Sequence, residues 1–317
     1  MAKGRERAGH GRDGAKAVSG TGGAGVQPSD RAPRSKPAGG LYLVATPIGN
    51  ARDITLRALD VLGAADLVAC EDTRVTGRLF AMLGLSAPLT PYHEHNAERA
   101  RPALLARLRE GAVVALVSDA GTPLVSDPGF RLVRACIEEE LPVTAVPGAS
   151  AALTGLQLSG LPTDRFLFAG FLPPKAAARR TALAELAAAP ATLVFYESAR
   201  RLPVALADMA TVLGDRAAAV ARELTKLFEE VRRGRLHELA AHYAAAGPPK
   251  GEVVIVVEAA GEATHTADDL DARLAVALGR ASVRDAAAEI AAATGLPRRE
   301  VYARAVVLAR ARDEERG

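Results

Sequence analysis

Four short segments of the chain combine polar and small residues in a way that suits ligand binding. They are 46–50 (TPIGN), 71–74 (EDTR), 118–123 (SDAGTP) and 147–151 (PGASA). Small residues let a backbone approach a ligand closely, and an aspartate such as Asp119 accepts hydrogen bonds from hydroxyl or ammonium groups. The segments are informative together and weak one at a time.

Each segment also has a structural explanation. Gly49 suits a tight turn, and Glu71 or Asp72 could cap a following helix, as could Ser150. One cap does not require two acids together with Arg74, however, so the surplus polar groups favour a functional role for 71–74.

These segments follow apolar runs that alternate with helical patterns, which is typical of a parallel α/β sheet. The first set of predicted strands is 41–45, 67–70, 113–117 and 143–146. A second set is predicted at 165–171, 192–196, 218–222 and 252–258, with helices beginning near Lys175 and Arg200. We therefore predict an α/β domain at 39–162 and a second at 163–262. Ligands of open α/β sheets bind where strands end, which is where the four segments lie.

The segment 263–317 is predicted to be a linker followed by a helical module. Ser282 and Asp285 form a capping box, and Pro297 can open a second helix, so the pair resembles a helix-turn-helix. Residues 280–312 hold seven basic against three acidic residues. Contact with nucleic acid and simple packing both remain open for this module.

The composition fits a globular protein without disulfides. Of 317 residues, 49% are hydrophobic and only two are cysteines, which suits the reducing cytoplasm. Residues 1–38 carry eight Lys or Arg against three Asp or Glu and are Gly-rich, so we predict a disordered basic tail. The uncharged stretch 141–163 is interrupted by prolines and glycines, which predicts buried interior and no membrane span. His93 and His95 lack further ligands nearby in sequence, so no metal is expected.

Six motifs in order and spacing resemble the bacterial ribosomal RNA small-subunit methyltransferase I family, which has the tetrapyrrole-methylase fold. They are LVATPIGN (43–50), CEDTR (70–74), SDAGTPLVSDPG (118–129), VPGASA (146–151), FYES (195–198) and RELTKLFEE (222–230). The resemblance covers roughly 40–260, and many members have a counterpart of the C-terminal helical pair.

The resemblance implies that S-adenosyl-L-methionine binds in a cleft between the two α/β domains, usually in a homodimer. The methyl group would pass to a cytidine ribose 2′-oxygen of small-subunit ribosomal RNA, either as isolated RNA or in the assembled 30S subunit. The loop 47–50 would border the methyl acceptor. The cofactor-binding residues implied are Pro47, Gly49, Asp119, Ala120, Gly121, Thr122, Pro147, Gly148, Ser150 and Ala151.

Methyl transfer from a sulfonium needs mainly an aligned acceptor oxygen, because the leaving group is already activated. A general base could add to the rate, and the candidates are Glu71, Asp72, Glu197 and Glu223. Arg74 or Lys226 could orient a phosphate or the 2′-hydroxyl. The sequence does not choose among these six residues.

Two alternative functions fit the same fold. One is a methyltransferase acting on a tetrapyrrole or cobalamin precursor, and the other is a non-catalytic RNA-binding factor for ribosome assembly. The CEDTR and RELTKLFEE segments, together with the basic helical module, favour ribosomal RNA over the tetrapyrrole.

Overall fold

The computed structural model describes residues 36–125, 129–261, 267–294 and 296–314. The predicted tail, residues 1–38, therefore lies outside the described residues except for its last three positions.

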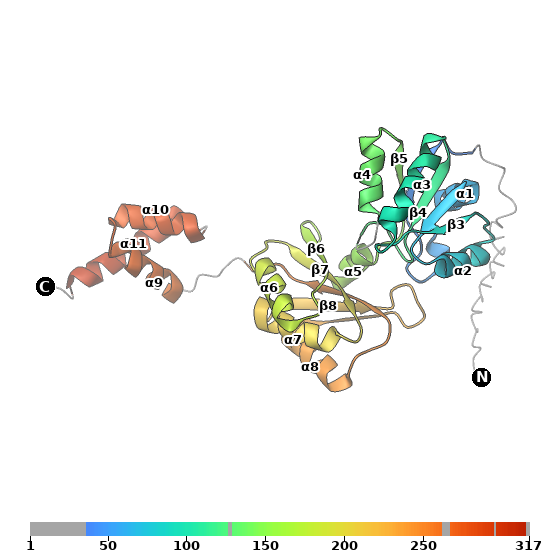
Figure 1. The fold of residues 1–317 in the computed structure, drawn as a ribbon. Coiled ribbons are helices and arrows are strands. Elements are labelled where there is room, and N and C mark those ends of the chain that lie inside the picture. Colours follow the sequence, from blue (N-terminus) through green and yellow to red (C-terminus); the bar gives the residue numbers. More distant parts are fainter. Residues whose placement is uncertain (1–35, 126–128, 262–266, 295, 315–317) are drawn as a thin grey trace, which may run out of the picture. The chain divides into compact units, whose positions relative to one another are not determined.

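The first half of the chain forms the predicted parallel sheet (Figure 1). Its strands are β1 (Gly40–Val44), β2 (Leu67–Cys70), β3 (Leu89–Pro91), β4 (Val113–Val117) and β5 (Val143–Val146), in the order β3-β2-β4-β1-β5. Its helices are η2 (Ala51–Asp53), α1 (Leu56–Ala64), α2 (Thr73–Leu83), α3 (Ala97–Arg109) and α4 (Phe130–Glu138). All pairs are parallel, so the carboxyl ends of the strands share one edge.

Both faces of this sheet are buried, which explains the uninterrupted apolar sequences of its central strands. All five residues of β4 are buried. Val117 belongs to a core cluster with Leu62 of α1, whereas Leu116 faces a second cluster with Leu104 of α3. Successive side chains of β4 therefore face two separate cores, and helices cover both faces of the sheet.

The second half of the chain forms a mixed sheet. Its strands are β6 (Phe166–Phe171), β7 (Thr192–Ser198), β8 (Ala217–Arg222), β9 (Glu230–Arg235) and β10 (Glu252–Val257), in the order β6-β7-β10-β8-β9. Only β6 and β7 pair in parallel, and the other neighbours are antiparallel. The helices α6 (Ala176–Leu186), α7 (Leu202–Leu213) and α8 (Leu236–Ala246) contribute to the core on one face.

Helix α5 (Ala151–Ser159) joins the two halves. It follows β5 of the first sheet, yet its Ala152 and Leu156 pack with Val194 and Val254 of the second sheet. A Cβ atom at Gly155 would lie 2.8 Å from Cγ1 of Val254, so a glycine is needed for this close approach. The loop that precedes α5 is consequently held beside the second sheet.

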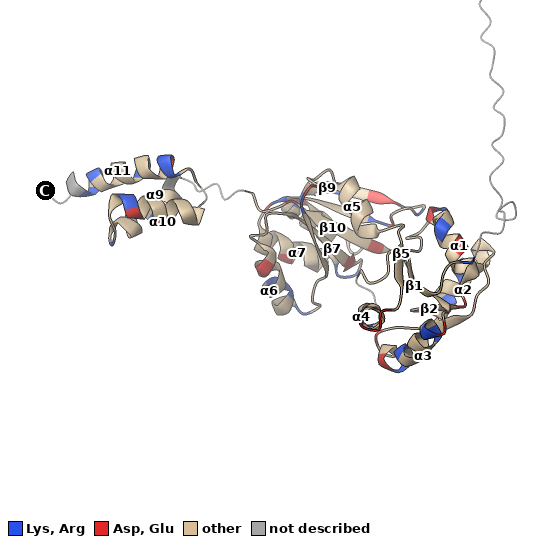
Figure 2. Cartoon of the chain, turned by 90° about the horizontal axis from the view of Figure 1, so that it is seen from above, with Lys and Arg blue, Asp and Glu red and all other residues tan. Residues whose placement is uncertain are grey.

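The C-terminal helices α9 (Ala267–Leu278), α10 (Val283–Thr294) and α11 (Arg298–Glu314) have their own core, which includes Leu274, Ala286 and Val301. The Ser282 half of the predicted capping box is present, and the Asp285 carboxylate accepts from the Ser282 hydroxyl (2.7 Å). The Ser282 hydroxyl oxygen accepts a hydrogen bond from the Asp285 amide (3.2 Å), and the Pro297 carbonyl accepts from the first turn of α11. Figure 2 marks Lys and Arg positions in blue along the ribbon of these helices. None of the described helices combines the length and the apolar character needed to cross a membrane.

Candidate active site

Hydrogen bonds join three loops at the carboxyl edge of the first sheet. Thr46 and Gly121 exchange backbone bonds of 2.9 and 3.1 Å. The Ser118 hydroxyl donates to the Gly121 carbonyl (3.0 Å), and the Thr122 hydroxyl donates to the Ala149 carbonyl (3.0 Å). Gly121 has φ +81°, a conformation that favours glycine. The segments after β1, β4 and β5 therefore form one hydrogen-bonded unit.

A cavity of about 400 Å³ lies between this unit and the second sheet. The first half of the chain lines it with Ile48, Asp119, Ala120, Gly121, Thr122, Val125 and Ala151. The second half lines it with Phe171, Tyr196, Glu197, Ser198, Ala199, Leu224, Gly251, Glu252, Val253 and Val254. The volume lies within the range of small-molecule and cofactor sites.

Half of the predicted cofactor residues line this cavity, namely Asp119, Ala120, Gly121, Thr122 and Ala151. The other half, Pro47, Gly49, Pro147, Gly148 and Ser150, do not line it.

Three of the non-lining positions have structural tasks. Ser150 is the N-cap of α5. A Cβ atom at Gly148 would lie 2.9 Å from Cβ of Ala45, and one at Gly49 would lie 2.5 Å from Cγ of Lys226. These positions shape the loops that border the cavity.

Three carboxylates gather where β2 and β4 end. The Asp72 amide donates to Oδ1 of Asp119 (3.1 Å). Burial, with the Asp119 charge second, raises the pKa of Glu71, and burial followed by the Asp72 charge raises the pKa of Asp119. Asp119 reaches the cavity, whereas Glu71 and Asp72 do not line it.

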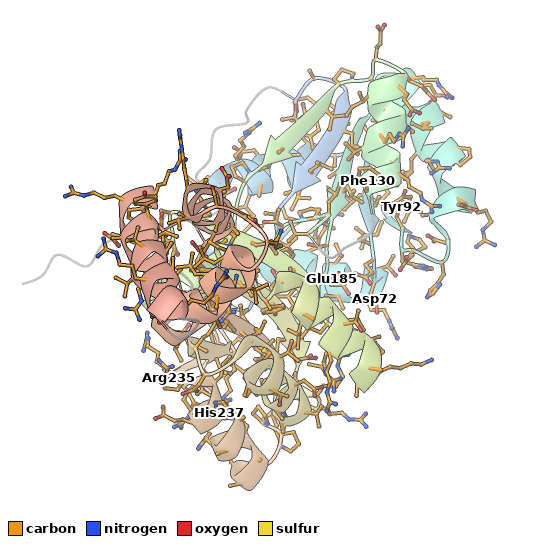
Figure 3. The ribbon with its side chains drawn as sticks, turned by 90° about the vertical axis from the view of Figure 1, so that its left-hand side faces the viewer. Asp72, Tyr92, Phe130, Glu185, Arg235 and His237 are labelled. Atoms are coloured by element: carbon orange, nitrogen blue, oxygen red, sulfur yellow. The ribbon has the colours of Figure 1, made fainter. Side chains whose placement is uncertain are left out.

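Asp72 (labelled in Figure 3) has a local structural role. It is the N-cap of α2, and its carboxylate lies 2.6 Å from Nη2 of Arg74. Hydrogen bonds from Arg74 hold the pKa of Asp72 at about 2. So low a pKa makes Asp72 a weak proton acceptor near neutral pH.

Glu197 is the one of the six candidate catalytic residues that lines the cavity. It is 2% exposed. Its Oε1 lies 2.6 Å from Nη2 of Arg201 and accepts from the Ser198 amide (2.7 Å). Its Oε2 is buried and has no hydrogen-bond partner in the described part of the chain.

Glu223 and Lys226 belong to the connection between β8 and β9. Nζ of Lys226 lies 3.0 Å from Oε1 of Glu223 and 2.8 Å from Oε2 of Glu252. Burial by itself would raise the pKa of Glu223 and lower that of Lys226, but the ion pairs outweigh burial. The pKa of Glu223 is therefore lowered and that of Lys226 is raised. The Asn50 amide donates to the hydroxyl oxygen of Thr225 (3.0 Å), so this connection touches the loop after β1.

Most residues of the second wall of the cavity carry no local signal in the sequence. Tyr196 falls inside the FYES motif, which is a usable signal, but Phe171 and 251–254 carry none. They reach the cavity through the mixed strand order, which is set by pairing between distant segments.

His93 and His95 lie near each other, with ring centroids 6.0 Å apart. Across the described ranges, no group of three or more His, Cys, Asp or Glu residues is arranged to hold a metal ion.

Comparisons with known proteins agree with this architecture. The family of tetrapyrrole (corrin/porphyrin) methylases matches residues 40–240, and the RsmI C-terminal HTH domain matches 264–309. The chain is 53% identical over 269 residues to ribosomal RNA small subunit methyltransferase I of Mesorhizobium japonicum, covering 84% of this chain and 92% of the relative. It is 50% identical over 290 residues to the protein of that name from Micromonospora olivasterospora, covering 89% and 91%.

A solved structure also resembles the chain. It is a uroporphyrin-III-C-methyltransferase from Thermus thermophilus, 27% identical, with a TM-score of 0.51 over 69% of this chain and 94% of the other.

Proposed function

Because the chain belongs to the ribosomal RNA small subunit methyltransferase I family, we propose that it methylates a cytidine ribose 2′-oxygen of small-subunit ribosomal RNA, using S-adenosyl-L-methionine. The observation that carries the proposal is the cavity between the two sheets, where the 119–122 loop faces Tyr196 and Glu197.

The donor set of the cavity fits S-adenosyl-L-methionine. Asp119 offers acceptors for hydroxyl or ammonium groups, Gly121 allows close backbone approach, and Phe171 and Tyr196 offer apolar walls. We assign Asp119, Ala120, Gly121, Thr122 and Ala151 to cofactor contact. Pro47, Gly49, Pro147, Gly148 and Ser150 support the loops. When bound, the cofactor supplies a methyl group on a positively charged sulfur that is already a good leaving group.

The residues of this chain then have to bind the RNA, orient its 2′-oxygen and exclude water. Four of the candidate catalytic residues, Asp72, Arg74, Glu223 and Lys226, do not line the cavity and are engaged in ion pairs. We therefore assign the rate enhancement to alignment of the acceptor, which can supply up to about 7–11 kcal/mol, rather than to a side-chain base.

The C-terminal helices are assigned to RNA contact. Arg298 and Arg299 are exposed in the first turn of α11, and neither forms an ion pair among the described residues. Positive charge at a helix N-terminus opposes the helix dipole, so helix stability does not explain these two residues. Arg280 and Arg304, by contrast, are paired with Glu289 and Asp271.

We further propose a homodimer that acts in the cytoplasm. The dimer rests on the family, and the location rests on the ribosomal substrate and on the free thiols of Cys70 and Cys136.

Transfer of tritium from labelled S-adenosyl-L-methionine tests the function. Small subunits from a strain lacking the gene, isolated small-subunit RNA and a tetrapyrrole precursor are offered separately. Incorporation into either RNA substrate is expected. Incorporation into the tetrapyrrole alone would replace the proposal with the small-molecule function, and cofactor-independent RNA binding without incorporation would favour the assembly factor.

A further inference from the structure

We propose that Tyr302 stacks on an unpaired base of the substrate RNA, while three arginines of the same helix, Arg298, Arg299 and Arg310, contact the neighbouring phosphates. The inference rests on the proposed function, because it names the side chains with which the C-terminal helices would hold that RNA.

The first observation is that Tyr302 lies outside the core of the C-terminal helices. Its side chain is 47% exposed, and it is the most exposed of the five tyrosines of the chain. Val301 and Ala305 of α11 are completely buried in that core and Leu308 packs against it, whereas Tyr302 does not belong to this cluster. Packing among α9, α10 and α11 therefore does not explain the aromatic ring.

The second observation is the arrangement of side chains along α11. Residues four apart are neighbours on a helix surface, so Arg298, Tyr302, Val306 and Arg310 form one row. Arg299 lies beside this row, three residues before Tyr302, and all three arginines are exposed. At about 1.5 Å per residue the row spans about 18 Å, which is room for several nucleotides.

The third observation is the distribution of charge on α11. Residues 298–312 contain five arginines and a single acid, Glu300, which does not lie on the row. Arg304 is paired with Asp271, and Arg312 donates to a carbonyl of α9 (2.8 Å), so these two arginines stabilise the helical module. The other three form no ion pair among the described residues. Contacts within the module thus leave these three positive charges unexplained.

An aromatic ring between unpaired arginines matches the chemistry of an unpaired stretch of RNA. Bases that are splayed out of a helix stack on aromatic side chains, and arginines bind the phosphates beside them. The same charges argue against a second copy of this chain as the occupant, because two such faces would repel each other.

Affinity for small subunits tests the stacking contact. Tyr302→Leu is expected to weaken binding at least about fivefold, whereas Tyr302→Phe, which keeps the ring, stays within about twofold of the wild type. Because neither change removes a charge, the salt dependence of binding stays that of the wild type. The matched control is Val307→Ala, at a 53% exposed residue of α11 away from the row, which keeps the wild-type affinity.

Tryptophan fluorescence tests the contact directly, because the chain contains no tryptophan. Tyr302→Trp places a single indole in the row, and its emission should be quenched when isolated small-subunit RNA is added, since a base stacks on the ring. Val307→Trp is the matched control, and its emission should stay unchanged.

Wild-type affinity of Tyr302→Leu, or emission of Tyr302→Trp that RNA leaves unchanged, would overturn the stacking contact and leave the proposed function intact. A loss of affinity with a lower salt dependence would also overturn it, because the substitution would then have displaced the arginines. Emission of Tyr302→Trp that depends on protein concentration and not on RNA would assign the row to self-association and overturn it likewise. Failure of the wild type to bind small subunits or to methylate RNA would overturn both proposals.

Discussion

At the residue scale, the carboxylates near the cavity differ because their surroundings differ. Hydrogen bonds from Arg74 lower the pKa of Asp72 to about 2, whereas burial raises the pKa of Asp119. The cavity wall therefore carries an aspartate whose charge is costly without a ligand, as expected for a binding residue.

Asp119→Asn is expected to weaken S-adenosylhomocysteine binding while leaving the melting temperature unchanged or raised at pH 7. The pKa of Asp119 is raised above its ordinary 3.8, so the folded state binds the proton more tightly than the unfolded chain does. This tighter proton binding stabilises the folded state at low pH, and the stabilisation is lost as pH rises through the folded-state pKa of Asp119. Because asparagine does not ionise, Asp119→Asn removes that loss.

Calorimetry across pH checks the binding part of this prediction. Wild-type affinity should fall as pH drops through the raised pKa of Asp119, and Asp119→Asn should flatten that dependence. An equally steep pH dependence in the variant would contradict the role given to Asp119.

Replacing the carboxylates that do not line the cavity by amides should have little effect on the rate of methyl transfer. Glu71→Gln, Asp72→Asn and Glu223→Gln are each expected to slow single-turnover methylation less than about tenfold, since a positioned base contributes about 10²–10⁴-fold. A loss of a hundredfold in any one of them, with the melting temperature preserved, would identify a general base.

At the element scale, the strands with an apolar run could be predicted, including the edge strands β5 and β6, whereas the edge strands β3 and β9 could not. The apolar runs of β1, β4 and β10 coincide with predicted strands. β3 is three residues long and ends in proline, and β9 has the sequence EVRRGR, so neither shows an apolar run. Both lie at sheet edges, where pairing with one neighbour is enough.

The contact between the loop after β1 and the connection from β8 to β9 depends on Gly49. A Cβ atom there would lie 2.8 Å from Oγ1 of Thr225 and 3.0 Å from the Leu224 carbonyl oxygen. Gly49→Ala should therefore destabilise the protein by about 1–3 kcal/mol in urea denaturation. Gly63→Ala, in helix α1 with its nearest neighbour at 3.6 Å, is the control and should be neutral or stabilising. Equal stability of the two variants would show that the loops are not in contact.

Helices α6 and α7 are joined by a buried ion pair. Asp208 lies 2.6 Å from Nη2 of Arg179, and both side chains are about 5% exposed. Asp208→Ala leaves the Arg179 charge buried and should cost about 3–5 kcal/mol of unfolding free energy. Arg180→Ala, which removes the 59% exposed partner, should cost less than about 1 kcal/mol. Similar losses from both changes would contradict this difference.

At the scale of the whole molecule, the first wall of the site could be predicted, whereas the second could be predicted only around Glu197. The 119–122 loop follows a parallel strand, and the carboxyl ends of such strands share an edge by geometry. Val254 reaches this wall because β10 pairs with β7 in antiparallel fashion, and Phe171 because β6 pairs with β7 in parallel, and no local pattern in the sequence specifies either pairing.

The C-terminal helices are expected to contribute to RNA affinity and not to cofactor affinity. Replacing Arg298 and Arg299 by glutamine should weaken subunit binding and lower the salt dependence of binding by about one unit for each lost phosphate contact. The affinity for S-adenosylhomocysteine should stay unchanged. A salt dependence identical to that of the wild type would exclude these arginines from the RNA interface.

The measurement that tests the central claim most directly is the location of the transferred methyl group. Small subunits methylated in vitro are digested to nucleosides and fragments, and mass spectrometry assigns the modified nucleotide and atom. One cytidine carrying its new methyl group on the ribose 2′-oxygen is the predicted result. A methyl group on a base, or none on the RNA while the protein binds S-adenosyl-L-methionine, would contradict the account.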